Sequence, residues 1–264
     1  MPGCVPGIIA PKMSRKIIKT IQAGPLVKQV VYPYASPADE PRVRKAKQRL
    51  SSAARQRLNY TAAWQRLELI LAANFGRDDW WVTFTYDNGH LPPDRDGAGR
   101  QMRNFLARLR RHLRKRKLEL RYVYNIEEMP DEPGGSRRLH HHAAISGDGL
   151  DPDTLRAVWG AGYVHIEPFL DGSNDCYETR ARYLIKERHP GVIGRKTGLR
   201  GWTASRNLKQ PEETTETVPD YMTLTAPADA FVLDSHEEHN VFGEYLYLKY
   251  LTPVRPKPKR RKRS

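Results

Sequence analysis

The stretch "DWWVTFTYDN" (Asp79–Asn88) begins the part of the chain whose pattern decides the fold. Its side chains alternate in character, and a period of two residues is typical of a β-strand. The residues that point one way are Trp80, Val82, Phe84 and Tyr86, and those that point the other way are Trp81, Thr83 and Thr85. We therefore expect a strand with one face toward an apolar core and one face that carries hydroxyl groups.

The segments that follow alternate between helical and strand patterns. A helix is expected from about Gly99 to Lys117, with Met102, Phe105, Leu109 and Leu113 on one face. The next segments are a strand in "LRYVYNIEE", a turn in "MPDEPGGSR", a strand in "RLHHHAAIS", a helix in "DPDTLRAVW", a strand in "GYVHIEPFL" and a helix in "DCYETRARYLIKE". This βαββαβ order predicts an α+β fold with a ferredoxin-like, RRM-like antiparallel sheet. Helices would cover one face and leave the other for a functional site.

The flanking regions suggest four further segments. Residues 1–14 are expected to be disordered, and residues 15–78 to form an N-terminal β-hairpin followed by a basic helix. That helix would begin near Ser36 and continue through a core stripe of Trp64, Leu67 and Leu71. A central domain over 79–210 is followed by an extension over 211–250, with a weak pattern of paired strands or helices. Residues 251–264 read as a basic disordered tail.

The composition favours a polyanionic partner. The 45 Lys and Arg residues outnumber the 30 Asp and Glu residues, which gives a formal net charge of +15. Such an excess favours nucleic acid through the release of counterions. Cys4 and Cys176 are too few for a disulfide framework, and no apolar run approaches the length of a membrane span. We expect a soluble cytoplasmic protein without a membrane partner.

The three histidines in "RLHHHAAIS" gain a geometric meaning from the strand pattern. His140 and His142 share a face, and their Cα atoms lie about 6 to 7 Å apart at strand spacing. Two imidazoles at that spacing can chelate one divalent ion. If the preceding strand pairs as an antiparallel hairpin, Glu127 comes close to His140. Glu128 is the rival carboxylate, although it shares the opposite face with Ile126 unless a β-bulge intervenes.

Two histidines and a carboxylate leave ligand positions open for water or a phosphate oxygen, as Mg²⁺ or Mn²⁺ nuclease chemistry requires. Other interpretations stay open at this point. The histidines can be incidental polar residues, and His165 and Glu167 form a second polar pair on one strand face. A structural zinc site would need a fourth ligand, usually cysteine, and none is placed for it.

A candidate nucleophile follows in "ARYLIKE". Tyr183 and Lys186 are three residues apart on an expected helix and so lie on one face. A tyrosine hydroxyl can attack a phosphodiester when a metal polarises the scissile phosphate, and Lys186 would neutralise phosphate charge. The pattern Y-x-x-K alone is weak, because it more often marks a helix with a half-buried tyrosine and an exposed lysine.

The threonine-rich strand "VTFTY", the histidine pair and Y-x-x-K, in this order, resemble the HUH endonucleases. More narrowly, they resemble the rolling-circle replication initiators of plasmids and filamentous phages. The resemblance covers about residues 80–210, so residues 79–210 would be an HUH endonuclease domain. This chain differs from the family pattern at the middle position of the histidine motif, where it has His141 in place of an apolar residue. "GWTASRNLKQP" also looks like the segment that follows the tyrosine helix in bacterial relatives.

The resemblance implies a mechanism and its residues. Tyr183 and Lys186 would be catalytic, and His140, His142 and Glu127 would hold Mg²⁺ or Mn²⁺. The enzyme would nick and rejoin single-stranded DNA at an origin hairpin through a 5′-phosphotyrosyl link, in the cytoplasm of a bacterial host. Host helicase and polymerase would be partners, because the chain has no P-loop motif. The residues expected to contact DNA are Thr83, Thr85, Arg103, Arg110, Arg114 and Arg206.

Two other functions compete with this one. A single-tyrosine transposase has the same motif order, and a non-enzymatic nucleic-acid-binding protein would need neither metal nor covalent adduct. Initiators with two tyrosines carry the second one four residues from the first, where this chain has Thr179 and Glu187. Tyr177 is six residues from Tyr183 and about 240° around the helix, so it should not share the site. The sequence therefore favours a single-tyrosine enzyme.

Overall fold

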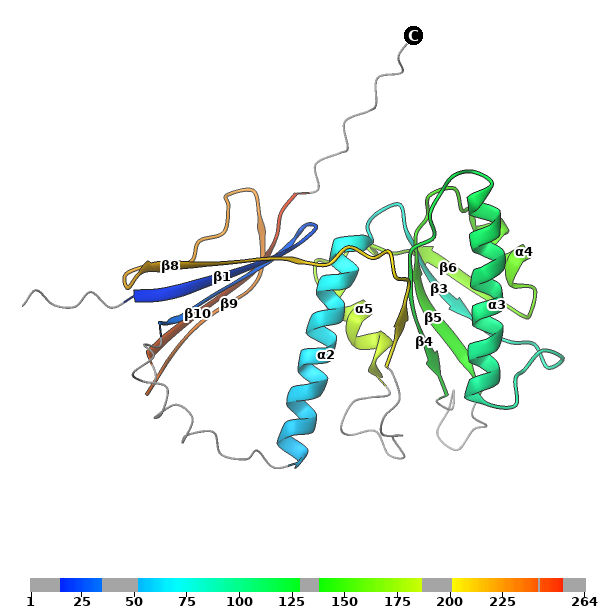
Figure 1. Cartoon of the computed structure of the whole chain (residues 1–264), viewed down its shortest axis with the longest axis horizontal. Helices are drawn as coiled ribbons and strands as arrows, with labels where there is room; N and C mark the ends of the chain where they lie inside the picture. Colours follow the sequence, from blue (N-terminus) through cyan, green and yellow to red (C-terminus); the bar gives the residue numbers. More distant parts are fainter. Residues whose placement is uncertain (1–14, 35–51, 129–137, 187–200, 242, 254–264) are drawn as a thin grey trace, which may run out of the picture. The chain divides into compact units, whose positions relative to one another are not determined.

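A computed structural model of the chain describes residues 15–34, 52–128, 138–186, 201–241 and 243–253 (Figure 1). The chain divides into two compact units. The central unit comprises Ala23–Leu26 and Arg49–Pro211, and the terminal unit comprises Met1–Gln22, Val27–Gln48 and Glu212–Ser264. No helix in the described part is long and apolar enough to cross a membrane.

The central unit is built on a five-stranded antiparallel sheet. Its strands are β3 (Trp80–Phe84), β4 (Tyr122–Glu127), β5 (His140–Ile145), β6 (Val164–Pro168) and β7 (Thr203–Ala204). Their order across the sheet is β6-β3-β5-β4-β7, and every neighbouring pair is antiparallel. The first four strands confirm the predicted split arrangement, because β5 lies between β3 and β4. The fifth strand, β7, lies in the segment "GWTASRNLKQP", for which the sequence pattern predicted no strand.

Helices α3 (Arg95–Arg114) and α4 (Pro152–Trp159) connect these strands and cover one face of the sheet (Figure 1). The predicted stripe of α3 is wholly buried, and it packs with Val82, Phe84, Tyr124, Ala143 and Ile145 of the strands. Helix α3 begins four residues before the expected Gly99 because the Asp94 side chain accepts a hydrogen bond from Gly97 N at 2.6 Å. Asp151 caps α4, because its side chain accepts a hydrogen bond from Thr154 N.

The opposite face is not free, which corrects the expectation of an uncovered face. Helix α5 (Cys176–Leu184) lies on this side of the sheet, and α2 (Ser52–Asn74) packs against α5 (Figure 1). Trp81 projects from β3 toward α5 and is only 4% exposed, because Phe169 and Tyr183 lie edge-on to its ring. The α2 stripe of Trp64, Leu67 and Leu71 is buried as predicted. Chemistry on this face is therefore confined to the part that α5 leaves accessible.

The terminal unit joins distant parts of the sequence in a second five-stranded sheet. The predicted hairpin is present as β1 (Arg15–Ala23) and β2 (Leu26–Pro33). It is flanked by β8 (Glu212–Pro219) on one side and by β10 (Gly243–Leu251) and β9 (Phe231–Asn240) on the other. The extension over 211–250 thus forms strands, and it shares a sheet with the N-terminal hairpin. The expected disorder of 1–14, the helix start near Ser36 and the tail beyond residue 253 lie outside the described residues.

Candidate metal and tyrosine site

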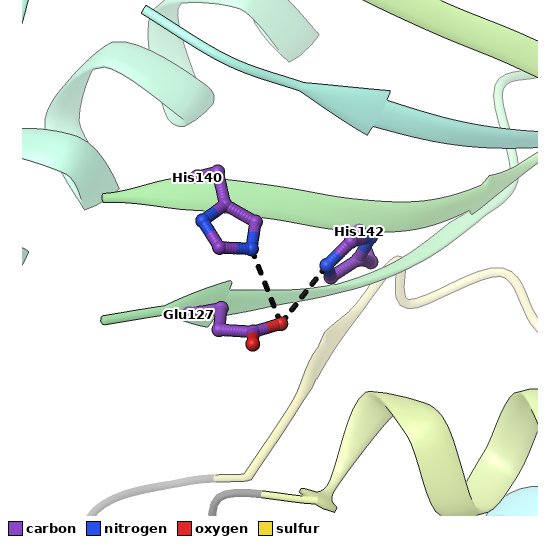
Figure 2. A group of neighbouring side chains, drawn as sticks. All are labelled: Glu127, His140 and His142. Carbon is purple, nitrogen blue, oxygen red and sulfur yellow. Dashed lines mark ion pairs between the residues drawn. The ribbon is translucent and has the colours of Figure 1, made fainter. Parts of the chain in front are cut away.

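The site begins with the antiparallel register of β4 and β5. Glu127 is opposite His140, and Asn125 is opposite His142. Since side chains alternate along a strand, Glu127, His140 and His142 all project from the face that lies toward α5. Figure 2 shows the two imidazoles of β5 turned toward the carboxylate of β4. The structure therefore brings these three sequence-predicted residues together.

The ring nitrogens of both histidines meet one carboxylate oxygen. His142 Nε2 lies 2.9 Å from Glu127 Oε2, and His140 Nε2 lies 3.3 Å from the same oxygen. The potential ligand atoms of the three residues all lie within 4.8 Å of one another. One small cation can contact all three side chains at such separations.

The opposite ring nitrogens are held by neighbouring groups. His142 Nδ1 is 3.0 Å from Thr83 Oγ1, and His140 Nδ1 is 3.1 Å from the carbonyl oxygen of Arg138. The Asn125 side chain also accepts a hydrogen bond from the backbone N of His142 at 3.1 Å. Such contacts fix the orientation of a ligating histidine and leave Nε2 free to bind.

The carboxylate of Glu127 is buried yet charged. Burial opposes ionisation, but His140, His142 and Lys186 together outweigh it and hold the pKa of Glu127 well below its usual range. Burial also opposes the charged form of His140, and Glu127 reverses that effect, so the pKa of His140 is raised. For His142, burial dominates and lowers the pKa. A neutral His142 beside an ionised Glu127 is the protonation state that metal binding requires.

The donor set fits a divalent ion. Glu127 Oε2 and His142 Nε2 are fully buried, and although they lie 2.9 Å apart, neither makes a hydrogen bond of acceptable geometry. Buried polar atoms without hydrogen bonds are costly, and a cation between them would satisfy both. Two imidazoles and one carboxylate supply the nitrogen and oxygen ligands that divalent metal ions bind.

Tyr183 reaches this group from the last turn of α5. Its ring centroid lies 4.6 Å from that of His142 in an edge-to-face contact and 6.0 Å from that of Trp81. Its side chain remains 39% exposed, so it is open to a ligand from solvent. The structure therefore brings Tyr183 to the group formed by Glu127, His140 and His142.

Lys186 lies just beyond the helix on which the sequence placed it. Helix α5 ends at Leu184, because Ile185 leaves the helical conformation with φ −116°. Lys186 Nζ still lies 4.0 Å from the Tyr183 ring centroid and 2.7 Å from Glu127 Oε1. Burial works against its charge, but Glu127 outweighs burial and raises the pKa of Lys186. The site therefore holds a cation beside the phenol.

Two residues that the site prediction did not include help to hold α5. The Arg180 guanidinium lies 4.5 Å from the Trp81 ring centroid and 2.7 Å from Glu167 of β6. The alternation of β3 places Trp81 on this face, but no sequence pattern signals Arg180. Tyr177 points away from the site, as expected, because its buried hydroxyl donates to the carbonyl oxygen of Phe75 at 3.1 Å.

The alternative acids are not part of this group. Glu128 lies 4.0 Å from Arg95 on the other face, and His165 pairs with Glu167 at 3.7 Å on the edge strand β6. The terminal unit contains a second set of close ligand atoms in Glu237, His239 and Glu244. Those residues are more exposed, and Glu244 already forms an ion pair with Lys16.

The residues predicted to contact DNA fall into two places. Thr83 lies beside His142, and Thr85 donates a hydrogen bond to the carbonyl oxygen of Tyr163 at 3.0 Å. Together with Arg138 and the two histidines they line a cavity of about 390 Å³ next to the site. The arginines lie elsewhere: Arg103, Arg110 and Arg114 are on α3, and Arg206 follows β7.

Comparison with known proteins gives a family match that covers this region. Residues 79–188 match the family model of replication-associated protein ORF2/G2P. No curated protein and no solved structure matches the chain. The matched segment runs from β3 through α5 and so contains every residue of the site described above. The central unit of this chain is thus similar to replication-associated proteins, and the similarity supports a role in replication.

Proposed function

We propose that this protein initiates DNA replication as a metal-dependent, single-tyrosine nickase and strand transferase of the HUH type. The observation that carries the proposal is the contact between the Tyr183 and His142 rings, with centroids 4.6 Å apart. It places a phenol beside a buried group of two imidazoles and one carboxylate. The similarity to replication-associated proteins supports the same conclusion.

Each residue of the site would have a separate role in strand cleavage. Glu127, His140 and His142 would hold Mg²⁺ or Mn²⁺, which would polarise the scissile phosphate as a Lewis acid. The Tyr183 oxygen attacks phosphorus, and the P–O bond to the 3′-oxygen breaks as the P–O bond to tyrosine forms. The phenol gives its proton to solvent. The 3′-oxygen takes up a proton from solvent and leaves as a hydroxyl. The Lys186 ammonium stabilises the negative charge on the phosphate oxygens.

The product would be a 5′-phosphotyrosyl link that retains the energy of the broken bond. Attack by a 3′-hydroxyl on this link reverses the step and rejoins a strand. The free 3′-hydroxyl made by nicking is a primer end for a host polymerase. Because the sequence carries no P-loop motif, unwinding would fall to a host helicase.

The test is covalent attachment to DNA. A panel of labelled single-stranded hairpin oligonucleotides is incubated with the full chain and Mn²⁺, and the products are separated on a denaturing gel. We expect a labelled protein–DNA band that disappears with EDTA. The substitution Tyr183→Phe should abolish the band and leave DNA binding unchanged, because it removes only the attacking oxygen.

Tyr177→Phe is the matched control, since Tyr177 lies on the same helix with its hydroxyl turned into the core. This variant should keep the covalent band. Persistence of the band in Tyr183→Phe would contradict the assignment of the nucleophile. Binding of DNA with no covalent product on any substrate would instead favour a non-enzymatic nucleic-acid-binding protein.

A further inference from the structure

A basic groove lies at the edge of the central unit, away from the metal and tyrosine site. Its cavity of about 590 Å³ is lined by the end of α3, the start of β4 and the turn after β7. Its charged members are Arg110, Arg114, Arg206 and Glu119. We call it the arginine groove. Tyr122, which also lines it, and Glu127 are at opposite ends of β4, about 17 Å apart at strand spacing.

The arginine side chains of this groove have no partner in the part of the chain that the structure describes. The side chains of Arg110, Arg114 and Arg206 are exposed and form no hydrogen bond or ion pair with any residue that the structure describes. Other basic residues of the same region have structural partners. Arg108 donates to the carbonyl oxygen of Val158 at 2.9 Å, and Arg116 donates to that of Gly149 at 2.9 Å. The groove thus keeps three guanidinium groups available.

The one acid in the groove does not neutralise them. Glu119 accepts a hydrogen bond from the side chain of Asn207 at 3.3 Å, and it forms no ion pair with a described residue. Three cations and one anion leave the lining with a net positive charge. Guanidinium groups bind phosphate oxygens through paired N–H donors.

The arginines also form a row that is longer than the groove. Arg103, Arg110 and Arg114 are spaced i, i+7 and i+11, which puts them on one stripe of α3. At 1.5 Å per residue the row extends about 16 Å. One strand of duplex DNA carries a phosphate about every 3.4 Å along its axis. A straight row of this length matches several phosphates of a duplex strand better than one small anion.

We propose that the arginine groove binds the phosphate backbone of duplex DNA, at a place distinct from the site where a strand would be cut. The inference rests on the proposed function, which identifies the polyanion as DNA. It gives the protein a second contact with the same nucleic acid. Duplex bound there would hold the chain on DNA without occupying Tyr183.

The test compares two triple variants of the full chain. One replaces the groove residues Arg110, Arg114 and Arg206 by alanine. The control replaces Arg77, Arg111 and Lys115, which are exposed, lie outside the groove and carry the same total charge. Binding of a fluorescent duplex of arbitrary sequence is measured by anisotropy at a series of KCl concentrations.

We expect the groove variant to lose about 2.7 from the slope of log K against log[salt], the value for three phosphate contacts. The slope of the control should fall by less than about 0.9, the value for one phosphate contact. Equal losses in the two variants would overturn the proposal. Replacing the same three arginines by lysine should restore the slope. If the alanine variant does not fold, Arg206→Glu alone serves, with Arg77→Glu as its control.

Two further measurements separate the alternatives. Calorimetry with AMP tests for a small phosphorylated ligand, and tight AMP binding that the groove variant loses would overturn the duplex assignment. The covalent band that the wild-type protein forms with a short single strand and Mn²⁺ tests the proposed nickase separately. Absence of that band in the wild-type protein counts against the proposed nickase alone, because the salt slopes do not depend on cleavage.

Discussion

The hydroxyl of Thr83 orients the imidazole of His142. Thr83 Oγ1 lies 3.0 Å from His142 Nδ1, and the opposite nitrogen faces Glu127. Removing such an orienting partner typically costs 10- to 100-fold in metal affinity. We therefore predict that Thr83→Val, which keeps the shape of the side chain, weakens Mn²⁺ binding about 10-fold. Titration calorimetry of the apo-protein with Mn²⁺ measures the effect.

Thr85→Val is the matched control for this prediction. Thr85 lies just after β3 and two residues beyond Thr83, but its hydroxyl donates to the carbonyl oxygen of Tyr163 and not to a histidine. Its loss should leave Mn²⁺ affinity unchanged. Equal weakening by both substitutions would mean that the hydroxyl of Thr83 has no specific role in orienting His142.

Some residues of this site were predictable from the sequence, and others were not. Strand alternation, together with the expected antiparallel hairpin, put Glu127, His140 and His142 on one face, because side-chain direction along a strand depends on local geometry. The position of Tyr183 does not follow from periodicity, since the loop after β6 determines where α5 lies. The resemblance to a known motif order supplied it. The sequence does not predict the contacts of Arg180, because an arginine on a helix is as often solvated as it is packed against a neighbouring strand.

Strand β5 places three consecutive histidines in two environments. His140 and His142 face the metal and tyrosine site, whereas His141 faces the helix-covered core and is fully buried. The Tyr86 hydroxyl and His141 Nε2 share a hydrogen bond of 2.7 Å, and the rings of Tyr124 and Trp159 lie edge-on to His141. Burial, together with the nearby His140, His142 and Arg95, lowers the pKa of His141 to about 3.

This environment predicts an acid-sensitive stability. An unfolded chain binds a proton at His141 below the ordinary pKa of about 6.5, whereas the folded chain does not until near 3. The stabilising effect of a neutral His141 is complete above pH 6.5 and is lost as the pH falls. The free energy of unfolding should decrease by up to about 1.4 kcal/mol per pH unit from this residue. Urea unfolding of the metal-free protein at several pH values measures the slope.

His141→Gln should reduce that slope, whatever its effect on absolute stability, because glutamine does not titrate. His90→Gln is the control, since His90 is exposed on a loop. A wild-type slope that matches the His141→Gln slope would show that His141 does not resist protonation in the folded state.

Elements with a strong period were predictable, and those that depend on distant partners were not. The strands β3 to β6 follow from alternating residues, and α3 follows from its apolar stripe. Strand β7 has only two residues, Thr203 and Ala204, and exists because β4 offers an edge to pair with. Helix α5 ends at Leu184, about one turn before the expected end, and no glycine or proline in "ARYLIKE" indicates that end.

At the scale of the whole molecule, the terminal unit is the part that sequence reasoning resolved least. Strand β8 has the sequence "EETTETVP", is almost entirely exposed and shows no alternation between apolar and polar residues. It pairs with β1, so that Arg15 lies opposite Pro219 about two hundred positions away. Pairing over such a distance leaves no local signal, because neither strand carries the information alone. The sheet therefore appears only when both ends of the chain are considered together.

The division into two units leads to a prediction about metal-dependent stability. All five tryptophans, Trp64, Trp80, Trp81, Trp159 and Trp202, belong to the central unit, which also contains Glu127, His140 and His142. Tryptophan fluorescence therefore reports unfolding of the central unit alone. A ligand that binds only the folded state stabilises it by about 2.7 kcal/mol at a concentration of 100 Kd.

We predict that Mn²⁺ shifts the fluorescence-detected unfolding transition of the full chain to higher temperature. Glu127, His140 and His142 lie within the central unit, so His142→Ala should remove the shift. His239→Ala, in the terminal unit, should keep it. Far-UV circular dichroism followed in parallel also reports the strands of the terminal unit, and any separate transition of that unit should not move with Mn²⁺. A shift that survives His142→Ala but disappears in His239→Ala would locate the metal at the exposed Glu237, His239 and Glu244 and would remove the basis for cleavage at Tyr183.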